Sequence, residues 1–243
     1  MRYFITEGAV ATEEVDGDTV RLRRLFDESR GCETFAQRIL SFGPGRSRER
    51  LETGADETLY ARDGSGTIAV AGEEHPLAPG TSVFVGRGTP WSVETADGVE
   101  LLSVLVLDPE PSPEAVHAVV DLAAEERLSA TASRQFSIGL DPEVGCRSVT
   151  QFVGFIPPGR APDHFHRYDE VLYVLDGEGR LHIDGEEEWL GPGSCVHLPA
   201  RLVHCLENTG DEEMRVLGVF RPAGSPAEAY YPDGTPAVYP SES

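Results

Sequence analysis

The sequence of 243 residues predicts an all-β protein built from two similar β domains in tandem. The first observation behind this prediction is the pattern of its apolar segments, which are short, rich in β-branched residues and separated by turn signals, with 26 Gly and 18 Pro in the chain. Such runs at close spacing are typical of β-sandwiches and barrels. Examples are TIAV at 67–70, TSVFV at 81–85 and LLSVLVL at 101–107.

The second observation is an internal repeat. ETLYARDGSGTIAV at 57–70 and EVLYVLDGEGRLHI at 170–183 share six identities in fourteen positions at an offset of 113 residues. LAPG at 77–80 and LGPG at 190–193 follow the same offset, whereas PGR at 44–46 and at 158–160 are related by an offset of 114. Self-similarity at a fixed period indicates copies of one structural unit. We therefore expect an N-terminal β domain at 1–110 and a C-terminal one at 131–243.

The segment between the two copies, 111–130, breaks the β pattern and predicts a short helical linker. Ser112 is a candidate N-cap and Pro113 suits the first helical position. The apolar residues that follow have a helical spacing. They are Val116, Val119, Val120 and Ala123.

The charge of the chain excludes several classes of function. It has 42 Asp plus Glu against 20 Lys plus Arg, a formal net charge of −22, so we expect no nucleic acid as a partner. All 20 cations are arginine. The absence of lysine excludes Schiff-base chemistry, lysine-anchored pyridoxal phosphate and a phosphate-loop nucleotide site.

The distribution of apolar residues and cysteines predicts a cytoplasmic protein without a membrane segment. No apolar run approaches the ~20 residues of a bilayer-spanning helix, and the first residues, MRYFITEGAVATEE, have no apolar signal region. The four cysteines form no CxxC pair and no dense framework, so we expect reduced thiols.

Histidines mark the second copy as the one that carries chemistry. Five of the seven lie between positions 164 and 204. His164 and His166 are two residues apart, so they share a face of an extended chain, and Glu170 has the same parity. His204 follows on what should be a neighbouring strand. Three imidazoles and one carboxylate that converge in a small barrel suit a divalent transition metal.

Two segments of this copy resemble the two motifs of the cupin family. GRAPDHFHRYDEVLYVLDG, 159–177, resembles the first motif, with its glycine, HxH, glutamate and second glycine. GSCVHLPARLVHCLEN, 193–208, resembles the second motif, with proline, histidine and asparagine in place. The match departs twice: four residues instead of five separate Gly159 from His164, and Arg201 stands where the second motif has a glycine.

The resemblance implies a bicupin, with two tandem double-stranded β-helix (jelly-roll) barrels joined by the helical linker. It implies His164, His166, Glu170 and His204 as ligands of one divalent transition metal per chain. Iron or manganese is favoured, and nickel, cobalt, copper or zinc is compatible. Cupin barrels often pair through edge strands, so the resemblance also implies a homodimer.

The first copy keeps the scaffold but not the metal ligands. Glu57 matches Glu170, whereas Trp91 falls where His204 is and the two positions that match His164 and His166 lie within 50–53 (RLET). We expect no metal in this barrel and a structural role for it. The alternative is a residual ligand-binding role with Trp91 and Arg87 at its mouth.

Further candidates for the site are Arg201, Tyr168 and His197, with Arg160 and Asp163 on nearby loops. Arg201 would hold a substrate carboxylate beside the metal, or would be a solvated loop arginine. His197 would line the cavity or face away from it. The candidates for the pocket wall depend on strand register. They are Gln151, Phe152, Phe155, Leu172 and Val174.

Three classes of function remain, all for a small, anionic or polar carbonyl substrate. The first is an oxygen-dependent dioxygenase with iron or another redox metal. The second is a non-redox isomerase, hydrolase or decarboxylase with manganese or zinc; the two-barrel architecture with one metal barrel is similar to that of ureidoglycine aminohydrolases, although their ligand set differs. The third is a non-catalytic binding protein, and we rank the classes in this order.

The remaining segments receive simpler interpretations. His75, His117 and His182 are interpreted as packed or solvated side chains. The Pro-rich tail at 221–243 is expected to wrap a surface or a partner subunit, with Tyr230 and Tyr231 as anchors.

Overall fold

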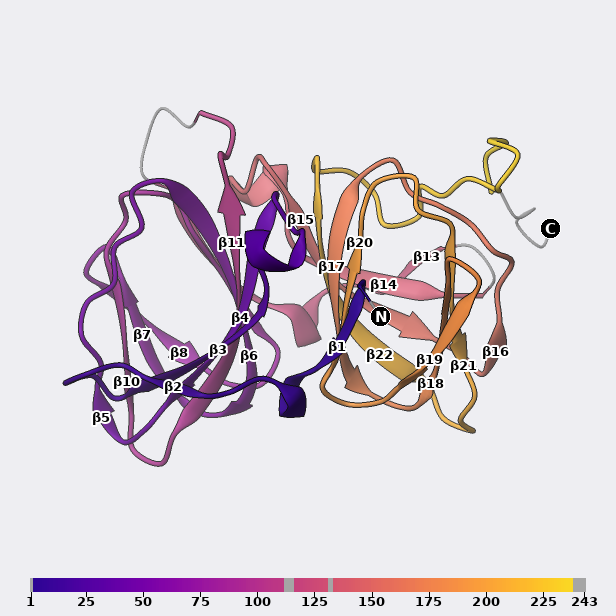
Figure 1. Ribbon diagram of the computed structural model, residues 1–243. Helices are drawn as coiled ribbons and strands as arrows, with labels where there is room; N and C mark the ends of the chain where they lie inside the picture. Colours follow the sequence, from indigo (N-terminus) through magenta and orange to yellow (C-terminus); the bar gives the residue numbers. More distant parts are fainter. Residues whose placement is uncertain (1, 112–115, 131–132, 238–243) are drawn as a thin grey trace. The chain divides into compact units, whose positions relative to one another are not determined.

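The computed structural model describes residues 2–111, 116–130 and 133–237, and in them it confirms the all-β fold class (Figure 1). The regular elements of these ranges are strands and four short 3₁₀ helices. The chain forms two compact units: the N-terminal unit is Glu7–Glu125 with Gly139–Val149, and the C-terminal unit is Met1–Thr6 with Glu126–Ile138 and Thr150–Ser243. Within the described ranges no helix is long and apolar enough to span a bilayer.

The N-terminal unit contains a seven-stranded and a four-stranded antiparallel sheet. The larger sheet has the order β12 (His117–Asp121), β9 (Thr81–Val85), β6 (Ala55–Gly64), β11 (Val99–Leu107), β4 (Phe35–Phe42), β3 (Val20–Phe26) and β2 (Glu13–Glu14). The smaller sheet has the order β5 (Gly45–Arg46), β10 (Trp91–Thr95), β7 (Gly66–Val70) and β8 (Glu73–Leu77).

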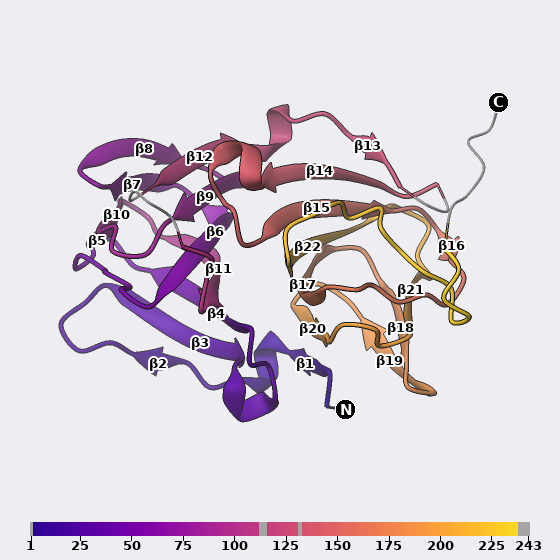
Figure 2. The ribbon, with the colours of Figure 1, turned by 90° about the horizontal axis from the view of Figure 1, so that it is seen from above.

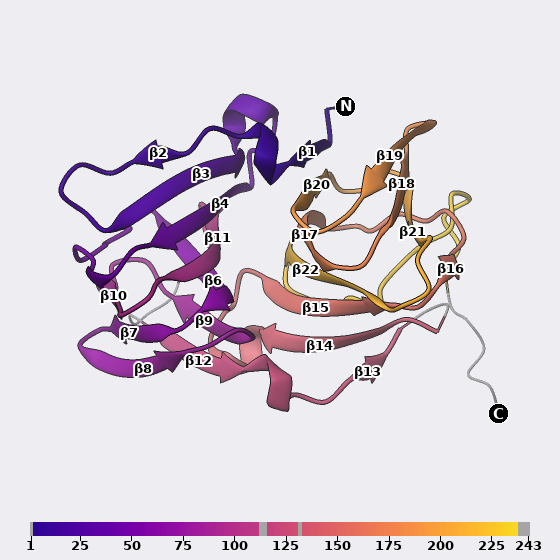
Figure 3. The same cartoon turned by 90° about the horizontal axis from the view of Figure 1, so that it is seen from below.

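The C-terminal unit has the same two sheets, which face each other in Figures 2 and 3. The larger sheet has the order β1 (Phe4–Thr6), β20 (Ser194–Leu198), β17 (Asp169–Asp176), β22 (Met214–Arg221), β15 (Thr150–Ile156), β14 (Gln135–Leu140) and β13 (Leu128–Ser129). The smaller sheet has the order β16 (Gly159–Arg160), β21 (His204–Asn208), β18 (Gly179–Ile183) and β19 (Glu186–Leu190).

The strand orders therefore confirm the internal repeat, element by element. Each copy also has a 3₁₀ helix capped by an aspartate and ended by a left-handed glycine, η2 (Glu28–Arg30) and η4 (Pro142–Val144). The remaining short helices are η1 (Glu7–Ala9) and η3 (Leu122–Ala124). The compact units cross the expected boundaries at 110 and 131, because the first strand of each copy, β1 or β12, joins the sheet of the other copy.

The predicted helical linker is wrong. Ser112 and Pro113 lie outside the described residues, but His117–Asp121 forms strand β12, and only Leu122–Ala124 makes a 3₁₀ turn. Val119 and Val120 are β-branched, and the edge of β9 offers this segment a ladder of backbone hydrogen bonds along the register from His117–Val85 to Asp121–Thr81. Tertiary pairing thus overrides the local helical spacing.

The repeated D-G-x-G sequence turns the chain between the two sheets of each unit. Gly64 and Gly177 have φ angles of +76° and +85°, which side-chain-bearing residues rarely adopt. A Cβ on Gly66 would lie 2.6 Å from the Glu94 carbonyl oxygen, and one on Gly179 would meet that of Glu207. In each copy, the first glycine of this sequence is needed for its positive φ angle. The second is needed because the backbone of the next strand approaches it closely.

Each unit has its own apolar core between its two sheets. Alternate residues of the strands supply it, because successive side chains of a strand point to opposite faces of the sheet. All four cysteines are buried and none forms a disulfide bond, as expected for reduced thiols.

A buried ion pair crosses the central strands of the N-terminal unit. Glu57 on β6 is 1% exposed, and Arg38 Nη2 on β4 donates to its Oε1 at 2.7 Å. The hydroxyl of Ser103 on β11 also donates to this oxygen, at 2.5 Å. Arg38 thus supplies a counter-charge to the buried carboxylate, and Ser103 adds a second hydrogen bond to the same oxygen.

Replacing Arg38 by Met should lower the free energy of unfolding by about 3–5 kcal/mol, because it leaves the Glu57 carboxylate buried without its counter-charge. Urea denaturation followed by circular dichroism measures this loss. The control is Arg24→Met, which removes an exposed pair with Glu13 and should cost at most about 1 kcal/mol. Equal losses of unfolding free energy in Arg38→Met and Arg24→Met would contradict the buried ion pair between Arg38 and Glu57.

Candidate metal centre

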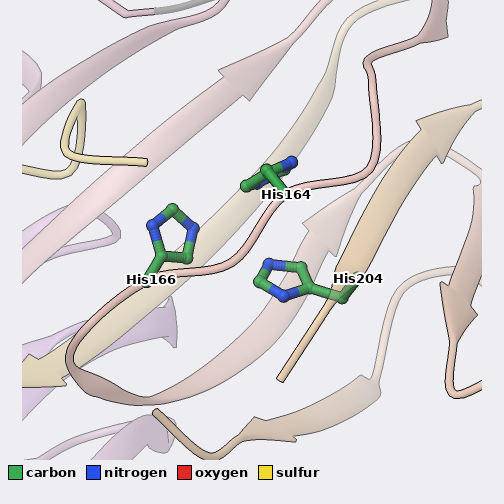
Figure 4. Close-up of side chains that lie close together, drawn as sticks. All are labelled: His164, His166 and His204. Carbon is green, nitrogen blue, oxygen red and sulfur yellow. The ribbon is translucent and has the colours of Figure 1, made fainter. Parts of the chain in front are cut away.

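Three imidazoles of the C-terminal unit meet in one place (Figure 4). His164 and His166 follow one another on the segment before β17, and His204 begins β21. The backbones of His164 and His204 form a two-way bridge, with N–H to oxygen distances of 3.0 and 2.8 Å. One ligand atom of each ring lies within 4.8 Å of one on each of the others. The structure thus brings together the three histidines predicted as ligands.

The hydrogen bonds of these rings determine which nitrogen is available to a metal. The Nδ1 atoms of His164, His166 and His204 lie 2.9, 2.7 and 2.9 Å from the carbonyl oxygens of Pro162, Glu228 and Leu202. A carbonyl oxygen can only accept, so each Nδ1 carries the proton and donates it. Each Nε2 is then left with a bare lone pair, the form in which imidazole binds metals.

Glu170 on β17 lines the same pocket but stands outside the group of ligand atoms that lie within 4.8 Å of one another. It is 3% exposed, and burial, reinforced by neighbouring Asp169, raises the pKa of its carboxyl to about 8. The structure therefore brings three of the four predicted ligands into mutual range and places the fourth on the wall beside them.

Burial also decides the charge of the histidines. It lowers the pKa of His166 to about 3 and the pKa of His204 well below its ordinary value, with further lowering by the neighbouring imidazoles. The pKa of His164 is lowered for the same first reason. All three rings are therefore neutral near pH 7, and a metal ion would not have to displace protons from them.

The pocket around the three rings is mostly apolar, with one cation and one phenol. Tyr168 stacks on His166 with ring centroids 4.6 Å apart, and burial raises the pKa of its hydroxyl well above 10, so that it remains a donor. Arg134, which precedes β14, lowers the pKa of all three histidines through its charge. The lining includes Arg134, Gln135, Phe136, Phe152, Gly154, Ile156, Tyr168, Glu170, Leu172, Leu206, Val216, Pro226 and Ala229.

Two wall segments were not expected to belong to the site. Arg134 lies thirty residues before His164, and no spacing rule connects it with the motif. The Pro-rich tail contributes Pro226 and Ala229, and the Glu228 carbonyl accepts from His166. Tyr230 fastens the tail by stacking on Phe165 at 5.6 Å. Of the pocket-wall candidates, Phe152 and Leu172 are in the lining.

Arg201 and His197 lie elsewhere in the described structure. Arg201 is exposed, has a φ of +69° and lines a second, open hollow that also includes Arg160, Asp163 and His204, the one clustered histidine in its described lining. His197 pairs across the strands with Val171, one residue past Glu170, so it faces the opposite side of the sheet. Its Nε2 lies 2.9 Å from an Asp169 carboxylate oxygen. The described lining of the histidine pocket includes neither residue.

The N-terminal unit has different residues at three of the four corresponding positions and keeps the glutamate at the fourth. Arg50 bridges Trp91 as His164 bridges His204, and Gly88 donates to the Glu52 carbonyl at 2.6 Å as Arg201 donates to that of His166 at 2.7 Å. Gly88 and Arg201 have the same left-handed φ, +76° and +69°, which identifies Arg201 with the motif glycine. The positions of His164, His166, Glu170 and His204 are thus held by Arg50, Glu52, Glu57 and Trp91.

Side-chain contacts explain how these replacements fit. Trp91 is 2% exposed and packs on Phe42, and the guanidinium of Arg50 lies 5.6 Å from the Trp91 ring centroid. Arg38 pairs with Glu57. Arg87, the other residue considered for the mouth, donates to the Pro109 and Glu110 carbonyls. Packing and ion pairs occupy the space that imidazoles line in the C-terminal unit.

Comparison with known proteins agrees with this geometry. The family model of the cupin domain (Cupin_2) matches residues 152–220, which include all four predicted ligands. Quercetin 2,3-dioxygenase of Bacillus subtilis is 36% identical over 80 residues, which are 29% of this chain and 24% of that protein. The chain thus spans about a quarter of the length of this relative.

Solved structures resemble nearly the whole chain. Oxalate decarboxylase of Bacillus subtilis superposes with a TM-score of 0.75 at 15% identity, over 92% of this chain and 78% of the other. A putative glyoxylate-induced protein of Pseudomonas aeruginosa gives a TM-score of 0.76 at 19% identity, over 89% and 87%. At such identities the likeness shows the fold. The chain therefore has the two-barrel bicupin fold, and residues 152–220 of its C-terminal barrel match the cupin domain.

Proposed function

We propose that the C-terminal barrel binds one divalent transition metal and catalyses an oxygen-dependent reaction of the dioxygenase type on a small anionic or carbonyl substrate. The observation that carries the proposal is the tautomer of the three histidines. Three Nδ1–H groups are held by backbone carbonyls, so three bare Nε2 lone pairs remain in a buried cluster. Such a cluster is costly without a cation.

The proposed ligands are His164, His166, His204 and Glu170. They leave two positions of an octahedral ion for water, substrate or oxygen, as catalytic sites do. Bound there, iron or manganese would supply Lewis acidity or one-electron chemistry to the substrate. Nickel, cobalt, copper and zinc are compatible with the same ligands.

The other pocket residues have roles that follow from their chemistry. Arg134 is a fixed cation beside the histidines and would hold a substrate carboxylate or enolate oxygen. Tyr168 would donate its phenol proton as a hydrogen bond. Phe152, Leu172 and Val216 would exclude water from the reacting atoms.

The second candidate is a non-redox decarboxylase, hydrolase or isomerase with manganese or zinc. It is favoured by the likeness to oxalate decarboxylase, which covers more of the chain than the quercetin dioxygenase match does. The same ligands and the same arginine would serve it. Dimerisation and a cytoplasmic location remain predictions from the sequence.

The His166→Ala variant should lose about one metal ion per chain relative to the wild type, because the ring supplies a ligand that no neighbour replaces. Elemental analysis of protein purified without a metal-binding tag measures the content. His182→Ala is the matched control, since His182 lies between the Glu187 and Glu207 carboxylates outside this pocket. An unchanged metal content in His166→Ala would overturn the site.

Oxygen uptake separates the two candidate functions. The iron-loaded protein should consume oxygen with small aromatic or organic acids, whereas the zinc-loaded protein should not. Oxygen-independent turnover with manganese or zinc would transfer the proposal to the second class. No turnover with any metal would leave a binding protein.

Arg134→Met should lower kcat/KM for an anionic substrate by roughly 10-fold to 100-fold, the usual cost of losing a charged hydrogen bond. Arg201→Met is the matched control and should change it less than about twofold. A larger loss of kcat/KM in Arg201→Met than in Arg134→Met would indicate that Arg201 binds the substrate carboxylate.

The stability of the metal-free protein should fall as the pH rises from 6.5 to 8. Folded Glu170 keeps its proton up to about pH 8, whereas the unfolded chain loses it near 4.5, so the unfolded state binds fewer protons in this window. The histidines, whose pKa values are lowered, act in the opposite direction only below 6.5. Urea denaturation in the presence of a chelator measures the slope, and Glu170→Gln should reduce it. An equal slope in the variant would exclude Glu170 as the cause.

A further inference from the structure

A second group of potential metal ligands lies in the N-terminal unit. Glu73 and His75 are on β8, and His117 begins β12. One ligand atom of each residue lies within 4.8 Å of those of the other two. The His117 Nε2 is 3.5 Å from a Glu73 carboxylate oxygen, and the rings of His75 and His117 have centroids 5.9 Å apart at an interplanar angle of 61°. These residues differ from those that correspond to the C-terminal site.

The strand registers direct the three side chains to the same place. Glu73 and His75 alternate with Leu77, which is 2% exposed in the apolar core, so all three share the inner face of β8. His117 has the parity of Val119, which packs against the same core. β8 and β12 are edge strands of different sheets, and Figures 2 and 3 show them side by side. The cluster therefore lies where the edges of the two sheets meet.

One polar atom in this cluster has no partner. The Nε2 of His75 is buried and forms no hydrogen bond within the described structure. A buried ring nitrogen in this state costs free energy unless a ligand satisfies it. In the C-terminal unit the offset of 113 places Glu186 and Glu188 at the positions of Glu73 and His75, so the histidine belongs to this unit alone.

We propose that Glu73, His75 and His117 form a second metal site that takes a zinc-type divalent ion and ties β8 to β12. Two imidazoles and one carboxylate form a known zinc ligand set, and tetrahedral zinc at about 2.0–2.1 Å needs ligand atoms roughly 3.4 Å apart. The ligand atoms of Glu73, His75 and His117 lie within 4.8 Å of one another, and rotation of the side chains brings them to that spacing. The side chain of Glu73 is 70% exposed, so water can take the fourth position. Such an ion would connect the edges of the two sheets.

Zinc titration of the full chain tests the site in a background that lacks the first one, the triple variant His164→Ala, His166→Ala and His204→Ala. This background should bind about one zinc per chain, and a hundredfold excess over Kd should raise its melting temperature by roughly 5 °C or more. His117→Gln in the same background should weaken zinc binding more than about 100-fold, since losing an outer-shell partner alone costs about 10–100-fold. His182→Gln is the control and should change neither value.

Two further measurements distinguish a loss of zinc binding from a loss of folding. Glu73→Gln changes an exposed side chain and should weaken zinc binding while it leaves the far-ultraviolet spectrum unchanged. In the otherwise wild-type chain, the zinc content after reconstitution should fall by one ion per chain in His117→Gln. Zinc binding that is the same in His117→Gln and Glu73→Gln as in their parent proteins would overturn the site.

Discussion

A carboxylate buried in the larger sheet of each barrel is the constraint on which both halves of the molecule depend. Glu57 and Glu170 occupy equivalent positions, at 1% and 3% exposure, and a buried carboxylate needs either a counter-charge or a proton. In the N-terminal unit Arg38 supplies the counter-charge at 2.7 Å. In the C-terminal unit the corresponding position, 152, is Phe, and the pKa of Glu170 is raised to about 8. A divalent metal held by the three adjacent imidazoles would supply the missing charge. The same scaffold therefore carries an ion pair in one copy and the proposed metal pocket in the other.

The histidine cluster owes its orientation to backbone carbonyls from three separate places. Pro162 and Leu202 each precede their histidine by two residues, so the local chain alone supplies these contacts. The third carbonyl, that of Glu228, comes from the tail, which Tyr230 fastens through its stacking on Phe165. The tail is thus part of the wall that orients His166. A metal site requires this kind of outer support, because the hydrogen bond on one ring nitrogen decides what the other nitrogen can bind.

Exchange of first strands explains the main error of the sequence-based prediction. β1 joins the sheet of the C-terminal unit at β20, and β12 joins that of the N-terminal unit at the equivalent strand β9. Val116, Val119 and Val120 have a helical spacing, but an isolated short helix is marginal, whereas an open sheet edge offers a full ladder of hydrogen bonds. The segment therefore becomes a strand. The same pairing brings His117, which had been interpreted as a packed or solvated side chain, next to Glu73 and His75.

The sequence by itself determined the all-β class, the duplication and the three histidines that converge, because each depends on short-range spacing: turns, strand parity and a fixed repeat offset. Only the tertiary structure decided the rest of the site. Arg134 rather than Arg201 lines the histidine pocket, and His197 faces the other side of the sheet from Glu170. Arg201 takes the left-handed conformation of the glycine it replaces, which leaves its side chain on the surface. Which residues of distant segments share a pocket depends on the pairing and register of strands that are far apart in the chain, and local spacing carries no information about that.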